Sequence, residues 1–216
     1  MSTDSHASGD APPLGRREKN RIEKTRRLVE AGLAVALEHG VEGATIERIT
    51  REAGIAKGGF YRYFDDQAHL VATILEPLVV PFRAALDRCE LELNDATTIE
   101  AQVVAYQHLA LSLAPIFFEH RDVMRLYLQE SRGPARGARA PLRDLADEIR
   151  ERAVKLTEVA RAAGRWRDVP GVVSALAVIG AVERLAWDAL NGADIGDPLE
   201  VGAALVGVVL DGLRER

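Results

Sequence analysis

Residues 43–64, GATIERITREAGIAKGGFYRYF, predict two short helices joined by a tight glycine turn. Ile46, Ile49 and Ala53 recur at offsets of three and four, which places them on one buried face of the first helix. Gly54 lies between the two helices, where its missing side chain permits the positive φ that a sharp turn requires. The pattern is therefore that of a helix-turn-helix.

The second helix of this pair, expected over about residues 56–63, carries cationic and aromatic side chains around two glycines. Lys57 and Arg62 can neutralise phosphates, and tyrosine hydroxyls can donate hydrogen bonds to them. The glycines allow the helix N-terminus to approach a duplex closely, where its dipole favours phosphate. A glycine turn and a polar face also occur in helical hairpins that bind no DNA, so this pattern alone leaves a purely structural hairpin open.

The longer run from Lys24 to Leu75 resembles the TetR family of bacterial transcriptional regulators. It has an amphipathic first helix ending at a glycine, a threonine opening the second helix, an A-G-[VI] turn, a K-G-x-x-Y-x-[HY]-F segment and a fourth helix that begins at an aspartate. The resemblance implies a three-helix DNA-binding domain followed by a helical domain that binds a small ligand and dimerises. The expected DNA contacts are Arg26, Thr45, Ile55, Ala56, Lys57, Gly58, Gly59, Tyr61, Arg62 and Tyr63.

Three positions depart from the family pattern, and each departure removes a polar contact. Ala56 stands where a serine commonly caps the recognition helix, Gly59 where a threonine is common, and Gln67 where a lysine opens the fourth helix. We therefore expect DNA affinity to depend more on the remaining cationic and tyrosine side chains and on the basic segment before them. A helical ligand-binding module with a decayed helix-turn-helix is the alternative that these departures keep open.

The segment 16–27 contains seven basic and two acidic residues, a net charge of +5, whereas the whole chain carries −5. This asymmetry indicates contact with nucleic acid at one end. A nonspecific architectural DNA protein would instead be basic overall. We expect a flexible arm that engages phosphates or the minor groove, with the first helix starting near Ile22; a solvated tail that only aids solubility is the alternative.

Composition and periodicity predict an all-α protein. The 216 residues are 47% hydrophobic and show no alternating strand pattern. We expect a disordered tail over 1–15, a TetR-like helix-turn-helix domain over 16–80, and a helical ligand-binding and dimerisation bundle over 81–216. In the first helix, His39 is expected on the buried face and Gly40 at the C-terminal end.

Prolines and glycines set the expected ends of the later helices. Pro77 and Pro81 should kink or end the fourth helix, and Pro115 should interrupt a helix that starts near Thr98. The segment 131–141, with three arginines, two glycines and two prolines, is predicted to be a mobile loop. Further helices are expected over about 121–129, 142–163, 171–191 and 198–214.

The last two helices are apolar and small on more than one face, whereas a surface helix needs only one apolar stripe. This composition suits close packing against a second copy of the chain, as the last two helices pack in the resembling family. A thick core within one chain is the alternative. The expected contact residues are Val172, Ala175, Ile179, Val182, Ala186, Ala203, Val206 and Leu210, with Ala189 and Leu199 beside them.

A ligand cavity is expected among the helices of the C-terminal half, as in the resembling family, and the aromatic residues of this half indicate an apolar effector. Each candidate residue is individually more often ordinary core or surface. The expected lining residues are Tyr106, Phe117, Phe118, Arg125, Tyr127, Trp166, Glu183 and Trp187, and His108 lies on the same helices.

No catalytic motif is found in the sequence. It contains no H-E-x-x-H, C-x-x-C, phosphate-binding glycine loop or G-x-S-x-G, so we expect no enzymatic activity, metal or cofactor. The single Cys89 excludes an internal disulfide, and no uninterrupted apolar run reaches the ~20 residues of a membrane span, so a cytoplasmic location is expected. The resemblance to the TetR family implies a homodimeric repressor that leaves a palindromic double-stranded DNA operator when a small molecule binds.

Overall fold

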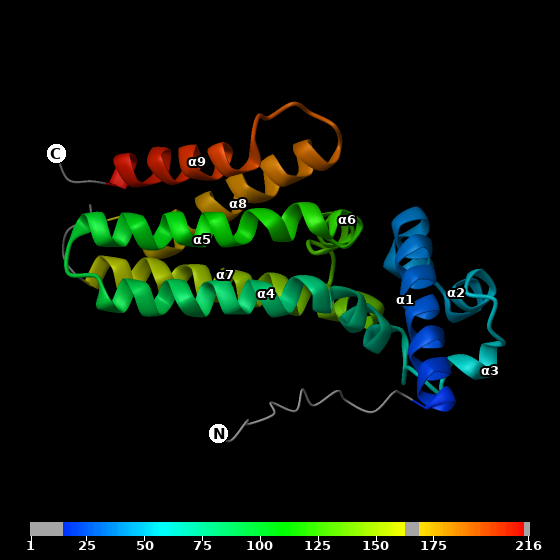
Figure 1. Ribbon diagram of the computed structural model, residues 1–216. Helices are drawn as coiled ribbons and strands as arrows, with labels where there is room; N and C mark the ends of the chain where they lie inside the picture. Colours follow the sequence, from blue (N-terminus) through cyan, green and yellow to red (C-terminus); the bar gives the residue numbers. More distant parts are fainter. Residues whose placement is uncertain (1–14, 163–168, 214–216) are drawn as a thin grey trace, which may run out of the picture.

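The computed structural model describes residues 15–162 and 169–213, and helices are the regular elements throughout those ranges (Figure 1). The all-α prediction is confirmed, while the expected disordered tail lies, except for Gly15, outside the described residues. The elements are α1 (Arg16–Gly43), α2 (Ile46–Glu52), α3 (Lys57–Phe60), α4 (Gln67–Asp95), α5 (Ile99–Glu119), α6 (Arg121–Glu130), the 3₁₀ helix η1 (Gly137–Arg139), α7 (Ala140–Ala162), α8 (Gly171–Leu190) and α9 (Pro198–Leu213).

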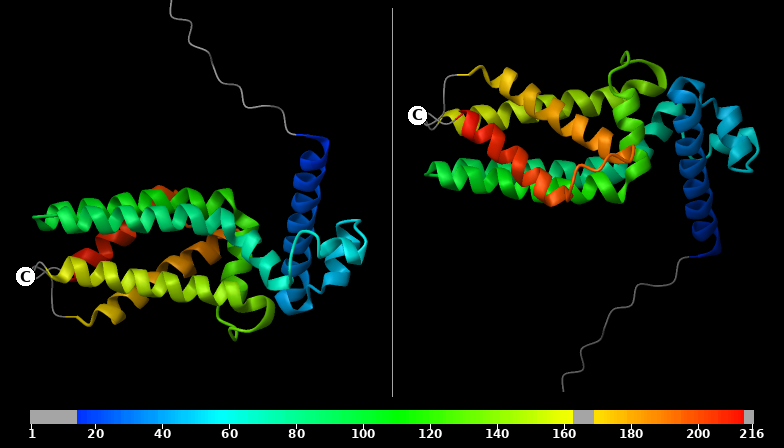
Figure 2. Two further views of the ribbon diagram at one scale, coloured as in Figure 1. Left: turned by 90° about the horizontal axis from the view of Figure 1, so that it is seen from below. Right: turned by 90° about the horizontal axis from the view of Figure 1, so that it is seen from above.

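The helices form an elongated bundle with the helix-turn-helix at one end. α4 packs against α5 and α7, α5 against α9, and α7 against α8. Both views of Figure 2 show α1 lying across that end of the bundle, with α2 and α3 on its outer side. The chain thus places the candidate DNA-reading surface at the end of the molecule, away from most of the bundle.

Helix α1 begins at Arg16, so the basic segment 16–27 forms its first turns. The expectation of a flexible arm is therefore wrong. Leu28, Ala31 and Val35 are buried as their spacing predicts, but His39 is exposed. Gly40 interrupts the helix with φ 71°, and one further turn follows it.

Three prolines lie inside helices that continue past them. α4 runs through Pro77 and Pro81 to Asp95, and α5 runs through Pro115 to Glu119, so the predicted interruption at Pro115 is wrong. Pro77 and Pro115 are exposed, so the carbonyl groups that lose their helical hydrogen bonds lie on the solvent side. Burial of apolar side chains on the opposite face holds the helices together.

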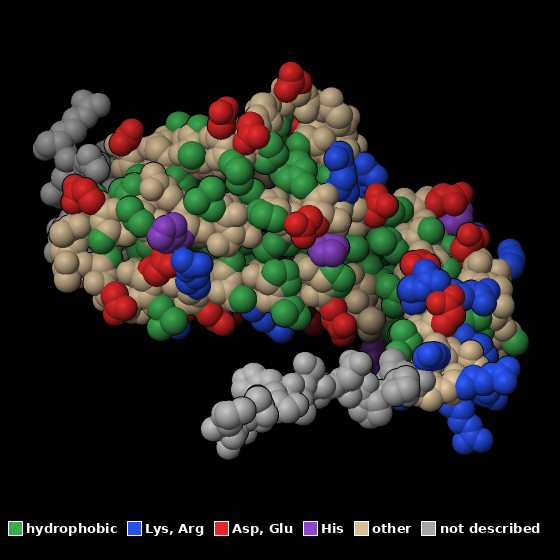
Figure 3. Space-filling model, in the orientation of Figure 1, with side chains coloured by type: hydrophobic (Ala, Val, Ile, Leu, Met, Phe, Trp, Pro, Cys, Tyr) green, Lys and Arg blue, Asp and Glu red, His purple; other side chains and the backbone are tan. Residues whose placement is uncertain are grey.

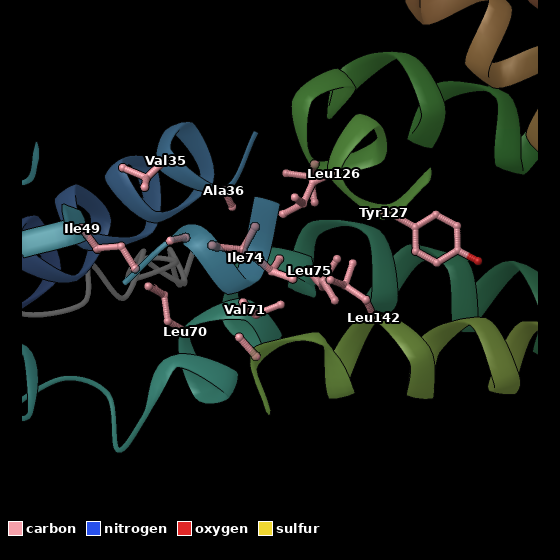
Figure 4. Close-up of a cluster of buried hydrophobic side chains, with 14 of the residues drawn as sticks. Val35, Ala36, Ile49, Leu70, Val71, Ile74, Leu75, Leu126, Tyr127 and Leu142 are labelled. Atoms are coloured by element: carbon pink, nitrogen blue, oxygen red, sulfur yellow. The ribbon is translucent and has the colours of Figure 1, made fainter. Parts of the chain in front are cut away.

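One hydrophobic core joins the helix-turn-helix to the bundle. It contains Val35 and Ala36 of α1, Ile49 of α2, Leu126 of α6 and Leu142 of α7, together with four residues of the first turns of α4 (Figure 4). The expected domain boundary at 80/81 lies inside α4, which belongs to both parts. Through this core, α4 and α6 are packed directly against the helices of the helix-turn-helix end.

α4 and α5 are each long and apolar enough to cross a membrane, judged by length and composition alone. Polar residues interrupt their apolar runs, so neither helix stands out as a continuous apolar segment in the sequence. Both helices pack within the bundle, on each other and on α7 and α9. Such packing is typical of the core helices of a helical bundle, so the two helices are weak evidence for a membrane span.

Candidate nucleic-acid interface and ligand cavity

The helix-turn-helix has the predicted geometry. The Thr45 side chain accepts a hydrogen bond from the backbone N–H of Arg48 at 3.4 Å and caps α2. Ile49 and Ala53 are buried, and Gly54 turns the chain with φ 61°. These local contacts fix the angle at which α3 leaves α2.

Helix α3 is shorter than predicted, spanning Lys57–Phe60, and the chain continues through turns as far as Tyr63. Phe60 is fully buried and anchors the segment, while Tyr61 is 56% exposed and Arg62 is also exposed. Tyr63 packs against the core. Of the residues expected at DNA, Thr45, Ala56, Lys57, Gly58, Tyr61 and Arg62 are exposed, whereas Ile55, Gly59 and Tyr63 are half-buried.

Two of the cations expected at DNA already have acidic partners. The Lys57 ammonium pairs with the Glu47 carboxylate of α2, which raises the pKa of Lys57 and lowers that of Glu47. Arg26 pairs with Glu23 at 2.7 Å and Glu30 at 2.6 Å along the exposed face of α1. Exposed pairs are weak, so phosphate can compete for both cations.

Two polar side chains whose contacts the sequence did not reveal hold the motif in place. Arg27 of α1 donates from Nη2 to the Ala53 carbonyl at the start of the turn. Gln67 donates from Nε2 to the carbonyls of Val41 and Ala44, at 2.6 and 2.7 Å, and so satisfies two carbonyls where α1 ends. Gln67 therefore replaces the expected lysine with a structural contact.

The two glycines of α3 differ in their surroundings. A Cβ atom on Gly58 would meet nothing within 4 Å, whereas one on Gly59 would lie 2.8 Å from Cγ2 of Ile55. A threonine at position 59 would require the Ile55 side chain to move. The absence of a polar side chain there thus has a steric reason in this chain.

Positive charge gathers at the helix-turn-helix end. Figure 3 shows many lysine and arginine side chains over α1–α3, with acidic side chains among them, while the bundle presents mixed acidic, basic and apolar side chains. The exposed cations of this end are Arg16, Arg17, Lys19, Arg21, Lys24, Arg26, Arg27, Arg48, Arg51, Lys57 and Arg62. A surface of this kind suits a polyanion.

The bundle contains a cavity of about 270 Å³ among α4, α5, α6, α7, α8 and α9, and this cavity is partly open to solvent. Its wall is almost entirely hydrocarbon. The sequence did not identify lining side chains such as Phe82, Leu109 and Leu145, because apolar residues at helical spacing do not reveal which of them face a cavity. Five of the expected lining residues do meet there: Tyr106, Phe117, Phe118, Tyr127 and Glu183.

Two of the other expected ligand residues, Arg125 and Trp187, do not line the cavity. Arg125 donates to the Leu190 carbonyl at 2.8 Å, where it caps the C-terminal end of α8, and it pairs with Asp122. Trp187 and His108 are absent from the wall, and Trp166 lies outside the described residues.

The few polar groups of the wall have identifiable partners. The Tyr106 hydroxyl donates to the Leu156 carbonyl at 3.2 Å, and the Tyr127 hydroxyl donates to Oε1 of Glu183 at 3.3 Å. Burial raises the pKa of both tyrosines, so both hydroxyls stay protonated. Arg132, outside the wall, pairs with Oε2 of Glu183 at 2.7 Å.

Several of the expected dimer residues face the interior of their own chain, and the dimer contact itself stays a prediction. Ala175, Ala186 and Leu210 are buried within one chain, and Ile179, Val182 and Val206 are half-buried and line the cavity. A residue that contacts a second copy must keep some exposed surface in a single chain, which the three buried residues largely lack. Only Val172 and Ala203 of the eight are exposed.

The segment 131–141 is anchored, contrary to the expectation of a mobile loop. Ala138 is buried, and Arg139 pairs with Glu130 of α6 and with Glu42 in the last turn of α1, each at 2.7 Å. α7 begins at Ala140, within the segment expected to be a loop. The Arg139 guanidinium thus joins the helix-turn-helix end to α6.

Comparison with known proteins agrees with this geometry. Residues 28–74 match the family model described as "Bacterial regulatory proteins, tetR family". The HTH-type transcriptional regulator SrpR of Pseudomonas putida is 32% identical over 63 residues, covering 29% of this chain and 30% of SrpR. The HTH-type transcriptional repressor KstR of Mycolicibacterium smegmatis is 32% identical over 69 residues, covering 32% and 34%. The chain thus matches about a third of the length of these curated relatives.

Solved structures share the fold over nearly the whole chain. NalD, the secondary repressor of the MexAB-OprM multidrug efflux pump in Pseudomonas aeruginosa, superposes with a TM-score of 0.69 at 18% identity, covering 91% of this chain and 98% of NalD. The fatty acid degradation regulator FadR of Bacillus halodurans superposes with a TM-score of 0.62 at 17% identity, covering 94% and 100%. At these identities the likeness concerns the fold alone.

Proposed function

Because this chain belongs, through its helix-turn-helix, to the TetR family, we propose that it is a homodimeric transcriptional repressor that binds a palindromic DNA operator. A small apolar effector enters the cavity and releases the DNA. The protein acts in the cytoplasm and has no enzymatic activity of its own.

The observation that carries this proposal is the exposed surface of α3 on a fixed support. Lys57, Tyr61 and Arg62 are exposed, while Phe60 beside them is fully buried in the core. Phosphate contacts from such side chains position a recognition helix on the duplex. Because α4 and α6 share that core and also line the cavity, a ligand that displaces them changes the support of α3.

The dimer surface of the proposal lies on the outer faces of α8 and α9. Val173 and Leu176 of α8, and Ala203, Gly207 and Val208 of α9, are exposed, and Val208 is 74% exposed. α8 and α9 are consecutive in the sequence, and both expose small and branched apolar side chains. Such side chains suit close packing against the same surface of a second copy. A second copy also supplies the second recognition helix that a palindrome requires.

The test is selection of DNA from a random double-stranded library by the full chain, followed by gel shift on the enriched sequence. The proposal expects a palindromic sequence that binds at least about a thousandfold more tightly than random DNA, with Lys57→Ala weakening binding. Equal affinity for all DNA, or none, would contradict it. The absence of any DNA binding would favour a ligand-binding module with a decayed helix-turn-helix, to which the uncapped Ala56 and the paired Lys57 also point.

A further inference from the structure

Glu183 is the carboxylate among the described residues that line the cavity. Its side chain is only 17% exposed. Oε1 accepts a hydrogen bond from the Tyr127 hydroxyl, and Oε2 accepts from Nη2 of Arg132 at 2.7 Å. The wall around it is almost entirely hydrocarbon. The Glu183 carboxylate is therefore the charged group with which a ligand in that part of the cavity can interact.

The partner that neutralises Glu183 is easily replaced. Arg132 does not line the cavity, its side chain is 76% exposed, and it extends from the segment that follows α6. An ion pair with so exposed an arginine is weak, because the guanidinium is nearly as well solvated by water. A ligand cation that approaches Glu183 from inside the cavity loses more of its hydration than the Arg132 guanidinium does. It gains a stronger interaction with the carboxylate in return, because the dielectric constant is lower there.

The charge of Glu183 also discriminates among ligands. A carboxylate placed beside Glu183 would be repelled, and the nearby Tyr127 hydroxyl already donates its hydrogen bond to Glu183. A neutral apolar molecule would fill space without using the carboxylate. We propose that the cavity binds an apolar amine, whose ammonium group pairs with the Glu183 carboxylate in place of the Arg132 guanidinium.

This inference rests on the proposed function only in treating the cavity as the effector site. The competing chemistry is an anionic amphiphile. Its counter-charge would be Arg161, the cation among the described lining residues, in the last turn of α7. The two chemistries are separated by molecules that share a hydrocarbon chain and differ in the head group.

The probes are decylamine, 1-decanol and decanoate, titrated into the full chain at pH 7 and followed by calorimetry. An alkyl ammonium is charged at this pH, as lysine is. We expect decylamine to bind about tenfold more tightly than 1-decanol, the ratio that one charge-assisted hydrogen bond provides. Decanoate should bind least tightly.

Three variants sharpen the test. Glu183→Gln keeps the size of the side chain and should abolish the preference for the amine while leaving 1-decanol binding unchanged. Arg132→Ala removes the competing cation and should tighten decylamine binding. Glu100→Gln, at an exposed carboxylate on the first turn of α5 that does not line the cavity, should change neither.

The proposal is overturned if decanoate binds as tightly as decylamine, if Glu183→Gln keeps the amine preference, or if none of the three probes binds. Decanoate binding that Arg161→Gln removes would assign the cavity to anions instead. DNA release is measured separately on the selected sequence. If decylamine binds but does not release the DNA, the proposed ligand class is retained and the effector role of the cavity is removed. If decanoate releases the DNA, the effector role of the cavity is retained and the proposed ligand class is overturned.

Discussion

At the helix-turn-helix end the core is closed around Leu28 and Phe60, both fully buried, and charge covers the surface, whereas the bundle leaves about 270 Å³ open among apolar side chains. A filled core holds α2 and α3 in one geometry, as recognition of a regular duplex requires. Apolar side chains around a void lack contact partners that a ligand can supply. One end is therefore built to keep its shape, and the other can gain stability by binding.

Helix α6 joins these two regions. Leu126 is fully buried in the core shared with α1, while Tyr127, the next residue, lies toward the bundle and lines the cavity (Figure 4). Arg139 adds a polar connection between α6 and α1. We therefore expect a ligand in the cavity to act on the helix that supports the reading surface, and each part of this contrast can be tested separately.

The largest effect is expected from a charge on the outer face of α8. Leu176→Glu places a carboxylate in the proposed dimer surface, where burial without a partner costs several kcal/mol. We expect a folded monomer, with DNA affinity reduced about a hundredfold or more because the second half-site no longer adds to binding. Light scattering and gel shift measure the two effects.

The inward face of the same helix is the control. Ala186→Glu buries the charge inside a single chain, so it should unfold the protein rather than separate two copies. A Leu176→Glu protein that remains dimeric would move the dimer surface away from α8. A folded monomer that still binds the palindrome with full affinity would separate dimerisation from DNA recognition.

The next largest effect distinguishes a filled core from a cavity wall. Leu126→Ala should cost about 2–5 kcal/mol of unfolding free energy, because it opens a new void in the shared core. Leu109→Ala in the cavity wall should cost about 1–2 kcal/mol, because that side chain is half-buried and already borders empty space. Urea unfolding compares them, and equal losses would show that the cavity is filled or collapsed in solution.

The sequence predicts the helix-turn-helix well because its determinants are local. The buried Ile49, the cap at Thr45 and the turn at Gly54 act within ten residues of one another, and spacing reveals them. The bundle is different, since its helices carry apolar residues on several faces. Helical spacing cannot tell that Ala175 faces the cavity while Leu176, its neighbour, faces solvent, because the neighbouring helices are distant in sequence.

A smaller effect should follow from cutting the polar connection between the two regions. Arg139→Gln leaves Glu130, which is 14% exposed, without its cationic partner, and we expect a loss of about 2 kcal/mol in unfolding free energy. Arg136→Gln, at an exposed position of the same segment, should stay within about 0.5 kcal/mol of the parent. If Arg139 couples the regions, its variant should also need a different effector concentration for DNA release, and an unchanged concentration would limit Arg139 to stability.

The smallest effect concerns the reading surface itself. Glu47 pairs with Lys57, and both side chains are more than half exposed, so the pair contributes little to stability. Its carboxylate nevertheless competes with phosphate for the Lys57 ammonium. We expect Glu47→Gln to leave the unfolding free energy unchanged and to raise DNA affinity about two- to fivefold at low salt, an energy within the range of one exposed ion pair.

Lys57→Ala should lower DNA affinity and reduce the slope of log affinity against log salt concentration by about one unit, as the loss of one phosphate contact requires. In the double variant the Glu47→Gln gain should vanish, because the cation that it frees is gone. A gain that persists without Lys57 would instead mean that Glu47 acts by general repulsion of the duplex.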